Sequence, residues 1–435
     1  MSVGSKVNSM KKLPVPEHIR HALRNNSIAL VKWLMFGMLI GLIMGVIGSF
    51  FHLSLEWAGE MRTACPWLLY LLPLGGLAIV AAYRLTGMSD DRGTEMVLSS
   101  IRSGERLHLR TAPLIFFSTV VTHLLGGSAG REGAALQLGG SVSSAIGRLF
   151  HLDDRDERIM TMCGMAAGFS ALFGTPISAA IFAMEVESVG VMYYAAVVPC
   201  LLSALLAQRV ALFFGITPTG FLVTGAPELD ARAMIPVILM GILCGILANL
   251  FCRVLRLGGK FYDRMTKNPW LRGALGGGFI ILLTLLTGTR DYNGAGMEII
   301  RAALAGQAVP YAFLLKMIFT ALTLNAGFKG GEIVPSFFVG ATFGCVAAPL
   351  LGLSPSFGAA VSMIAVFCGV TNAPMTSILL GYELFTGVGI APMALIAAIS
   401  YMTSGYHSLY HEQKILYSKI RPKFINTFSG DESEE

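Results

Sequence analysis

The sequence contains little charge. Only 13% of its 435 residues are Asp, Glu, Lys or Arg, whereas 54% are hydrophobic. Apolar stretches long enough to cross a bilayer recur along the chain. This composition excludes a soluble protein of two or three domains and predicts an integral membrane protein with many spans. The formal net charge of +6 is modest and lies mostly near the chain ends, so nucleic-acid binding is not predicted.

Cysteines are few and scattered. The seven cysteines have no CxxC spacing and stand mostly in apolar surroundings. We expect them to be small core residues, forming neither a disulfide framework nor a metal site, and we expect no cofactor. The first apolar segment, residues 29–51, also lacks a following cleavage site of small residues, which favours a retained helix over a signal peptide.

The distribution of basic residues predicts the topology. Lys and Arg gather before the first span, between residues 102 and 110, and near the C-terminus. Because basic residues collect on the cytoplasmic side, both termini are predicted to be cytoplasmic. We expect a cytoplasmic N-terminal helix, a first transmembrane repeat, a second transmembrane repeat, and a C-terminal helix with an acidic tail, over residues 1–28, 29–225, 226–405 and 406–435. A short loop after the first span would carry Glu56, Glu60 and Arg62.

The stretch Gly126–Ser141, GGSAGREGAALQLGGS, places a charged pair where a glycine-rich turn meets an apolar run. Arg131 and Glu132 at membrane depth are costly, so they indicate a functional site. Glycines let backbone N–H groups approach a ligand closely, and a helix opening at Glu132 would direct its free N–H groups into the same space. The stretch therefore predicts an anion site.

The second half of the chain repeats these landmarks. A shift of 200 residues places Gly130, Glu132 and Gly140 on Gly330, Glu332 and Gly340. A shift of 198 places Pro176 and Glu185 on Pro374 and Glu383. This series indicates an internal duplication. Many transporters are built in this way, with the binding site where interrupted segments of the two halves meet. Here those segments are Gly126–Ser141 and Gly327–Gly344.

Each buried glutamate has two interpretations. Glu132 is either half of a local pair with Arg131 or a titratable gate that occupies the anion site and leaves when protonated. Adjacent residues on a helix do not face each other, which favours the gate. Burial and helix N–H groups shift a carboxyl pKa in opposite directions, so such a gate can titrate. Glu332 is either paired with Lys329 or a second station for a proton or anion.

These motifs resemble those of the CLC family of anion channels and transporters. Gly130-Arg131-Glu132-Gly133 is similar to the family's GREG motif, and Gly330–Pro335 stands at its second-half helix start. The likeness covers residues from about 30 to about 420. It implies an all-α membrane protein of two inverted repeats with many tilted and broken helices, and a homodimer with one anion pathway per subunit. In the family, the carboxylate matching Glu132 is the external gate, and the tyrosine matching Tyr410 lines the inner anion site.

Three departures from the family pattern refine the expected function. The motif with the central serine is replaced by SDDRGTEMV, Val186 stands where exchangers carry an inner proton-transfer glutamate, and Glu332 replaces an apolar residue. The chain therefore resembles the fluoride/proton antiporter branch, which implies a fluoride exporter of the prokaryotic plasma (inner) membrane that confers fluoride resistance. Glu132 and Glu332 would gate and carry protons. The predicted anion-binding residues are Gly130, Arg131, Gly133, Ile333, Val334, Tyr410, Thr94 and Met96.

Other functions remain open from the sequence alone. A chloride/proton exchanger and a passive anion channel share the expected fold, and a sodium-coupled solute carrier is a further class. The stretch Gly126–Gly130 also fits GxSxG, with His123 nearby, which would suit an intramembrane hydrolase. We expect a transporter and not an enzyme, because the motif lacks a visible strand–turn–helix context and a positioned base.

Four other polar residues in apolar runs have structural interpretations. Glu185 and Glu383 stand at equivalent helix ends, which favours capping or interface roles. His123 is expected to be packed and hydrogen-bonded. Asn325 and Asn372 each stand beside a helix break, where amides commonly satisfy freed backbone groups.

Overall fold

A computed structural model describes residues 17–228 and 230–430, and it confirms the all-α prediction with sixteen α-helices in that part of the chain. The first eight, with two short 3-10 helices, are α1 (Glu17–Ala64), η1 (Pro66–Leu71), α2 (Leu72–Leu85), α3 (Thr94–Ser103), α4 (Thr111–Leu124), α5 (Glu132–Leu149), α6 (Asp154–Phe173), α7 (Pro176–Glu185), η2 (Tyr194–Ala196) and α8 (Val197–Phe213). The second eight, with one more 3-10 helix, are α9 (Ala231–Met265), α10 (Pro269–Thr287), α11 (Met297–Leu304), α12 (Ala312–Asn325), α13 (Ile333–Ala347), η3 (Ala348–Leu351), α14 (Pro355–Thr371), α15 (Pro374–Leu384) and α16 (Ile390–Thr403).

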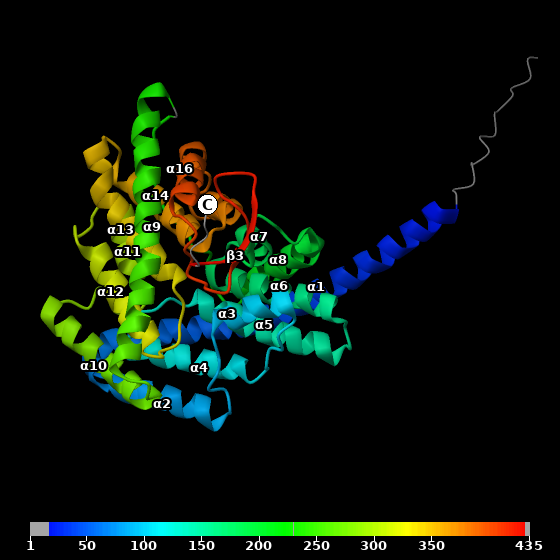
Figure 1. Cartoon of the computed structure of the whole chain (residues 1–435), viewed down its shortest axis with the longest axis horizontal. Coiled ribbons are helices and arrows are strands. Elements are labelled where there is room, and N and C mark those ends of the chain that lie inside the picture. The colour runs from blue at the N-terminus through cyan, green and yellow to red at the C-terminus, as the bar shows by residue number, and fades with distance from the viewer. Residues whose placement is uncertain (1–16, 229, 431–435) are drawn as a thin grey trace, which may run out of the picture.

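The second eight helices repeat the first eight in order. In Figure 1 α5 to α8 of the first set and α11 to α16 of the second set lie on different sides of the molecule, with the red C-terminal segment between α7 and α14, whereas α10 lies beside α2. Six helical stretches in the described part are long and apolar enough to cross a membrane. Others are short: α4 and α12 have 14 residues each, or about 21 Å. A bilayer core is about 30 Å thick, so these helices end inside it. The fold is that of two inverted repeats.

Helix α1 is longer than predicted. It continues without a break to Ala64, so Glu56, Glu60 and Arg62 lie on a helix and the expected loop is wrong. The first proline after the start of α1 is Pro66, so no proline interrupts the helix before Ala64. Glu56 pairs with His52, one turn earlier on this helix, at 3.1 Å. Residues 17–28 begin this same helix, whose first part projects beyond the rest of the molecule (Figure 1). Residues 1–16 lie outside the described part.

The predicted C-terminal helix over residues 406–435 is wrong. The segment forms strands β2 (Lys414–Tyr417) and β3 (Phe424–Phe428), which pair antiparallel, and β2 pairs parallel with β1 (Ser188–Val189). Pro422 lacks a backbone N–H and cannot sit inside a helix, while the β-branched and aromatic residues of both strands favour extended backbone. The acidic tail after Gly430 lies outside the described residues.

The core is formed where helices of one repeat cross closely. A Cβ on Gly139 of α5 would lie 2.0 Å from the Gly164 carbonyl oxygen of α6, and a Cβ on Gly344 of α13 would lie 2.1 Å from the Gly358 oxygen of α14. Only glycine allows these backbones to approach so closely. Both repeats therefore bury the broken helices α5 and α13 in the same way.

Candidate anion and proton site

The two predicted interrupted segments meet at a single antiparallel bridge. The Gly130 N–H donates to the Gly331 oxygen at 2.7 Å, and the Gly331 N–H donates to the Gly130 oxygen at 2.8 Å. Helices α5 and α13 begin within two residues of this bridge. Their free N–H groups are therefore held in one small region, which favours a bound negative charge.

The Glu132 carboxylate occupies this region. Glu132 is fully buried, and its Oε2 accepts hydrogen bonds from the Arg131 N–H at 3.0 Å and the Val334 N–H at 3.3 Å. One donor precedes α5 and the other lies in the first turn of α13. Oε1 has no hydrogen-bond partner among the described residues. The structure thus places a carboxylate between the helix starts of both repeats, beside buried Ile333, the first residue of α13.

The Arg131 side chain points mostly away from this carboxylate. Its Nε lies 3.7 Å from Glu132 Oε1, a long ion pair. The guanidinium contacts His52 Nδ1 at 3.3 Å and the Leu172 oxygen at 3.4 Å, and it lies over the Phe173 ring. The predicted pair with Arg131 is therefore present only as this long contact, and the hydrogen bonds of the Glu132 carboxylate are to the N–H groups at the two helix starts.

Thr94, in the segment that replaces the family's serine motif, contacts helix α5. Gly93, with φ of 70°, precedes α3, and the Thr94 hydroxyl donates to the Gly133 oxygen at 3.4 Å while accepting from Gln137 Nε2 at 3.3 Å. Thr94 therefore packs against the first turns of α5. Met96 lies on α3 packed against the core and is not among the residues that line the cavity described next. Sequence reasoning missed Gln137, which has no distinguishing motif.

A cavity of about 820 Å³ leads to the second glutamate; we call it the vestibule. Glu332, Thr94 and Tyr410 all line it. Glu332 stands at the N-cap of α13 and is partly exposed, unlike the fully buried Glu132. Seven Arg or Lys and four Asp or Glu line the vestibule, namely Arg84, Arg92, Arg256, Lys260, Lys267, Arg272 and Lys329, with Asp91, Glu95, Asp263 and Glu332. This excess of positive charge attracts anions.

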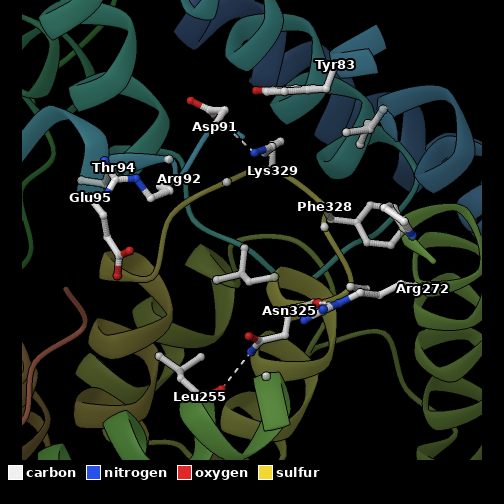
Figure 2. A pocket seen from close by; sticks show the side chains of 18 of the residues that line it. Tyr83, Asp91, Arg92, Thr94, Glu95, Leu255, Arg272, Asn325, Phe328 and Lys329 are labelled. Carbon is white, nitrogen blue, oxygen red and sulfur yellow. Dashed lines mark hydrogen bonds and ion pairs between the residues drawn. The ribbon is translucent and has the colours of Figure 1, made fainter. Parts of the chain in front are cut away.

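Lys329 does not pair with Glu332, which rules out the alternative considered from the sequence. Its Nζ forms an ion pair with Asp91 Oδ2 at 3.1 Å and lies 4.3 Å from the centre of the Tyr83 ring. Figure 2 shows Asp91, Lys329 and Tyr83 grouped at one end of the vestibule. This pair joins the loops before α3 and α13, one from each repeat. Within the described residues, the Glu332 carboxyl forms no ion pair.

The Tyr410 side chain lines the vestibule together with Glu332. Tyr410 is 2% exposed, and its hydroxyl has no hydrogen-bond partner among the described residues. A buried hydroxyl without a partner is costly and indicates a position where a ligand or water accepts its hydrogen.

Glu185 and Glu383 are caps, as predicted. Glu185 accepts from the Met375 and Thr376 N–H groups of α15 at 3.0 and 2.8 Å. Glu383 accepts from the Ile177 and Ser178 N–H groups of α7 at 2.9 Å each. Each repeat thus supplies the carboxylate that satisfies the helix start of the other.

The other polar residues also have structural contacts. His123 is buried with Nε2 3.3 Å from the Gly130 oxygen, as expected for a packed histidine. Asn325 donates to the Leu255 and Ala321 oxygens at 2.9 Å each, also as predicted.

The contacts of Asn372 and Ser128 settle two further expectations. Asn372 ends α14 with φ of 56° and donates to Gln413 Oε1 at 2.9 Å, which agrees with its predicted place at a helix break. The Ser128 hydroxyl bonds to Thr320 Oγ1 at 3.1 Å, not to His123, so the hydrolase alternative lacks its base.

Broken helices of two inverted repeats that meet at a buried carboxylate define a multi-pass membrane transporter or channel for anions. The chain belongs to the voltage gated chloride channel (CLC) family, whose model matches residues 75–405. It is 36% identical over 398 residues to the "chloride/fluoride channel protein" of Pseudomonas syringae pv. tomato, covering 90% of this chain and 88% of that protein. It is 26% identical to the H(+)/Cl(-) exchange transporter ClcA of Vibrio campbellii, covering 80% of each chain. A crystal structure of a CLC-type fluoride/proton antiporter superposes with a TM-score of 0.85 and 30% identity, covering 89% of this chain and 98% of that one.

Proposed function

We propose that the protein is a fluoride/proton antiporter that exports fluoride. The observation that carries this proposal is the position of Glu132, whose Oε2 accepts N–H groups from the helix starts of both repeats, at 3.0 and 3.3 Å. An anion that entered this position would use the same donors, so the carboxylate and the anion compete for them. Protonation removes the charge of Glu132 and releases the donors. One proton step is thereby linked to one anion step.

Glu332 supplies the second proton station in this proposal. It is related to Glu132 by the internal repeat, yet it faces the vestibule instead of the bridge. Water in the vestibule would exchange protons with Glu332 directly. A separate inner carboxyl at the position of Val186 is then unnecessary.

The donors of the site and two of the relatives support fluoride as the anion in this proposal. Fluoride is small and strongly hydrated, so it needs donors close at hand, which the Val334 and Arg131 N–H groups and the unpartnered Tyr410 hydroxyl provide. The 36% identical relative is named for chloride and fluoride, and the 30% identical structure is titled a fluoride/proton antiporter.

The basic lining of the vestibule supports an orientation. Cytoplasmic surfaces of membrane proteins carry an excess of Lys and Arg, and seven of these residues line the vestibule. We infer that the vestibule opens to the cytoplasm, that both termini lie on that side, and that the Glu132 gate is reached from outside. The bacterial relatives support a prokaryotic plasma membrane.

The test is reconstitution of the full chain in liposomes with fluoride and chloride electrodes. A proton gradient is expected to drive fluoride uphill in the native protein. Glu132→Gln and Glu332→Gln keep the side-chain size but cannot lose a proton, so both should abolish proton-driven accumulation. Glu298→Gln is the matched control, since the Glu298 side chain is 84% exposed and, within the described residues, pairs with neighbouring Arg301 alone. Proton-driven accumulation that survives in Glu132→Gln would contradict the gate.

Chloride/proton exchange is the second candidate, favoured by the 26% identity to a named chloride/proton exchanger. The same liposomes separate the two. Rapid proton-driven chloride movement with fluoride excluded would replace the first proposal with the second, and flux of either anion without proton coupling would indicate a passive channel.

A further inference from the structure

The segment that carries Tyr410 has no regular structure of its own. It follows α16 and precedes β2, and it is held against the end of α14 by the Leu409 N–H and the Ser408 hydroxyl, which donate to the Val370 oxygen at 2.9 and 3.1 Å. The position of the Tyr410 phenol therefore depends on contacts made by its neighbours in the chain.

Gln413 makes further contacts that hold this segment. Its backbone N–H donates to the backbone carbonyl oxygen of Tyr410 at 3.2 Å. Its side-chain amide donates to the Val186 and Thr371 oxygens, both at 2.7 Å, and its Oε1 accepts from Asn372 at 2.9 Å. One buried amide thus ties the Tyr410 segment to the ends of α7 and α14.

Lys419 supports the other side of Asn372. The Lys419 ammonium donates to Asn372 Oδ1, to the Gly405 oxygen and, at 3.1 Å, to the Ser404 hydroxyl. Asn372 is thereby bonded by Lys419 at one end of its amide and by Gln413 at the other. Lys419 therefore also contacts the end of α16, where the Tyr410 segment begins.

We propose that Lys419 is a positioning residue of the inner anion site: through Asn372 and Gln413 it holds the segment that presents the Tyr410 hydroxyl to the anion. The role of Tyr410 in this statement rests on the proposed function. The Lys419 contact itself does not, because it is a property of the C-terminal segment that is measurable without transport.

No carboxylate lies within ion-pair distance of Lys419 in the described part of the chain. Its acceptors are neutral, and the Tyr401 and Tyr406 rings lie 4.7 and 6.0 Å away. The titratable and charged groups around it come from α9, α14, α7, α16 and the following segment, namely Cys252, Arg256, Cys368, Glu185, Tyr401, Tyr406 and His407.

Protonation of Lys419 makes this contact sensitive to pH. Burial of the ammonium lowers the pKa of Lys419 to about 7. A lysine released into water keeps its proton up to about pH 10.4. Below about pH 7 Lys419 is protonated whether buried or released, so the free energy of the buried contact is constant and least favourable there. Above about pH 7 only the buried lysine loses its proton, so the buried contact becomes more favourable as the pH rises. Acid on this side of the membrane should therefore loosen the Tyr410 segment.

The experiment measures fluoride exchange by the full chain in liposomes with equal pH on both sides, from about pH 6 to about pH 8.5, on either side of the Lys419 pKa. Lys419→Met removes every donor and should raise the half-saturating fluoride concentration about fivefold below pH 7, as expected for the loss of one net hydrogen bond. The increase should be larger above pH 7, where the native contact is more favourable and methionine cannot titrate. Lys419→Arg keeps the donors and a permanent charge. Its half-saturating fluoride concentration should equal the native value at acid pH and should not show the native decrease above pH 7.

Lys423→Met is the matched control, because Lys423 is an exposed lysine four residues further along the same segment. It should keep the native half-saturation and pH profile. Hydrogen exchange of residues 405–413 gives a readout independent of transport: exchange should be faster in Lys419→Met and unchanged in the control.

Native half-saturation, native pH profile and native exchange in Lys419→Met would overturn the proposal. If that variant does not fold, Lys419→Arg tests the proposal. A half-saturating fluoride concentration that still decreases above pH 7 in Lys419→Arg would be inconsistent with titration of Lys419. If the native protein moves no fluoride, the proposed function fails by itself, and hydrogen exchange with pH still tests the Lys419 contact.

Discussion

At the scale of residues, the bridge between Gly130 and Gly331 decides where the Glu132 carboxylate lies. The two backbones bond to each other at 2.7 and 2.8 Å, which leaves no room for side chains between them. A Cβ on Gly130 would lie 2.7 Å from Glu132 Oε2 and 3.0 Å from the Gly331 oxygen. Glycine at this position is therefore required by the close approach of the gate and not by an unusual backbone angle.

Gly130→Ala tests this requirement. The added methyl group must displace the carboxylate or the opposite backbone, so proton-coupled flux should fall about tenfold or more, the loss of at least one hydrogen bond to a charged group. The measurement is fluoride flux per folded protein in liposomes. Gly278→Ala is the control, since a Cβ there meets nothing within 4 Å. Equal flux from the two variants would show that the bridge tolerates a side chain.

At the scale of elements, the starts of the short helices α7 and α15 are satisfied across the repeat boundary. The Glu185 carboxylate bonds to two N–H groups of α15, and the Glu383 carboxylate bonds to two of α7. Both helices begin with proline, and their first N–H groups would be costly at membrane depth without these carboxylates. The exchange of caps locks the two repeats in one relative position.

Removal of either cap should lower stability without changing the chemistry of transport. Glu185→Ala and Glu383→Ala are each expected to reduce the free energy of unfolding by about 1–2 kcal/mol, the upper part of the range for lost helix caps. Thermal unfolding in detergent measures this loss, and the ratio of protons to fluoride should remain native. A changed ratio with native stability would instead assign a proton-transfer role to that carboxylate.

At the scale of the whole molecule, α7 and α15 form a face that is too short to span a membrane. They have 10 and 11 residues, about 15 Å each, half of the bilayer core. Ile177, Met375 and Tyr382 are 41%, 53% and 54% exposed on this face. We propose that a second copy of the chain covers it, which agrees with the homodimer predicted from the sequence.

A mass measurement in mild detergent tests the homodimer. We expect about twice the 46.5 kDa of one chain. Ile177→Trp combined with Met375→Trp adds bulk to this face and should give the monomer mass. If each subunit has its own pathway, as the family resemblance implies, the proposed fluoride transport should be retained. A native mass equal to one chain would exclude the dimer.

The sequence by itself determined the class of fold, the repeat and the identity of the two glutamates. Apolar composition and glycine-rich turns are local properties, and a duplication keeps its landmarks at a nearly constant offset. Glu132 and Glu332, and likewise Glu185 and Glu383, stand at matching positions of the two halves that the sequence alone indicates. The continuation of α1 to Ala64 was missed because charged residues at a membrane surface resemble a loop.

Only the tertiary structure decided which groups meet. Three contacts join residues that are 43 to 238 positions apart in the sequence, and no local pattern encodes them. They are the ion pair of Lys329 with Asp91, the hydrogen bond of Gln137 with Thr94 and the hydrogen bond of Lys419 with Asn372. The C-terminal sheet likewise needs β1, more than 200 residues earlier, to complete it. Equivalent positions in the repeats gave Glu132 and Glu332 the same sequence signal. Their different surroundings, a sealed bridge and an open vestibule, arise only when the two halves pack together.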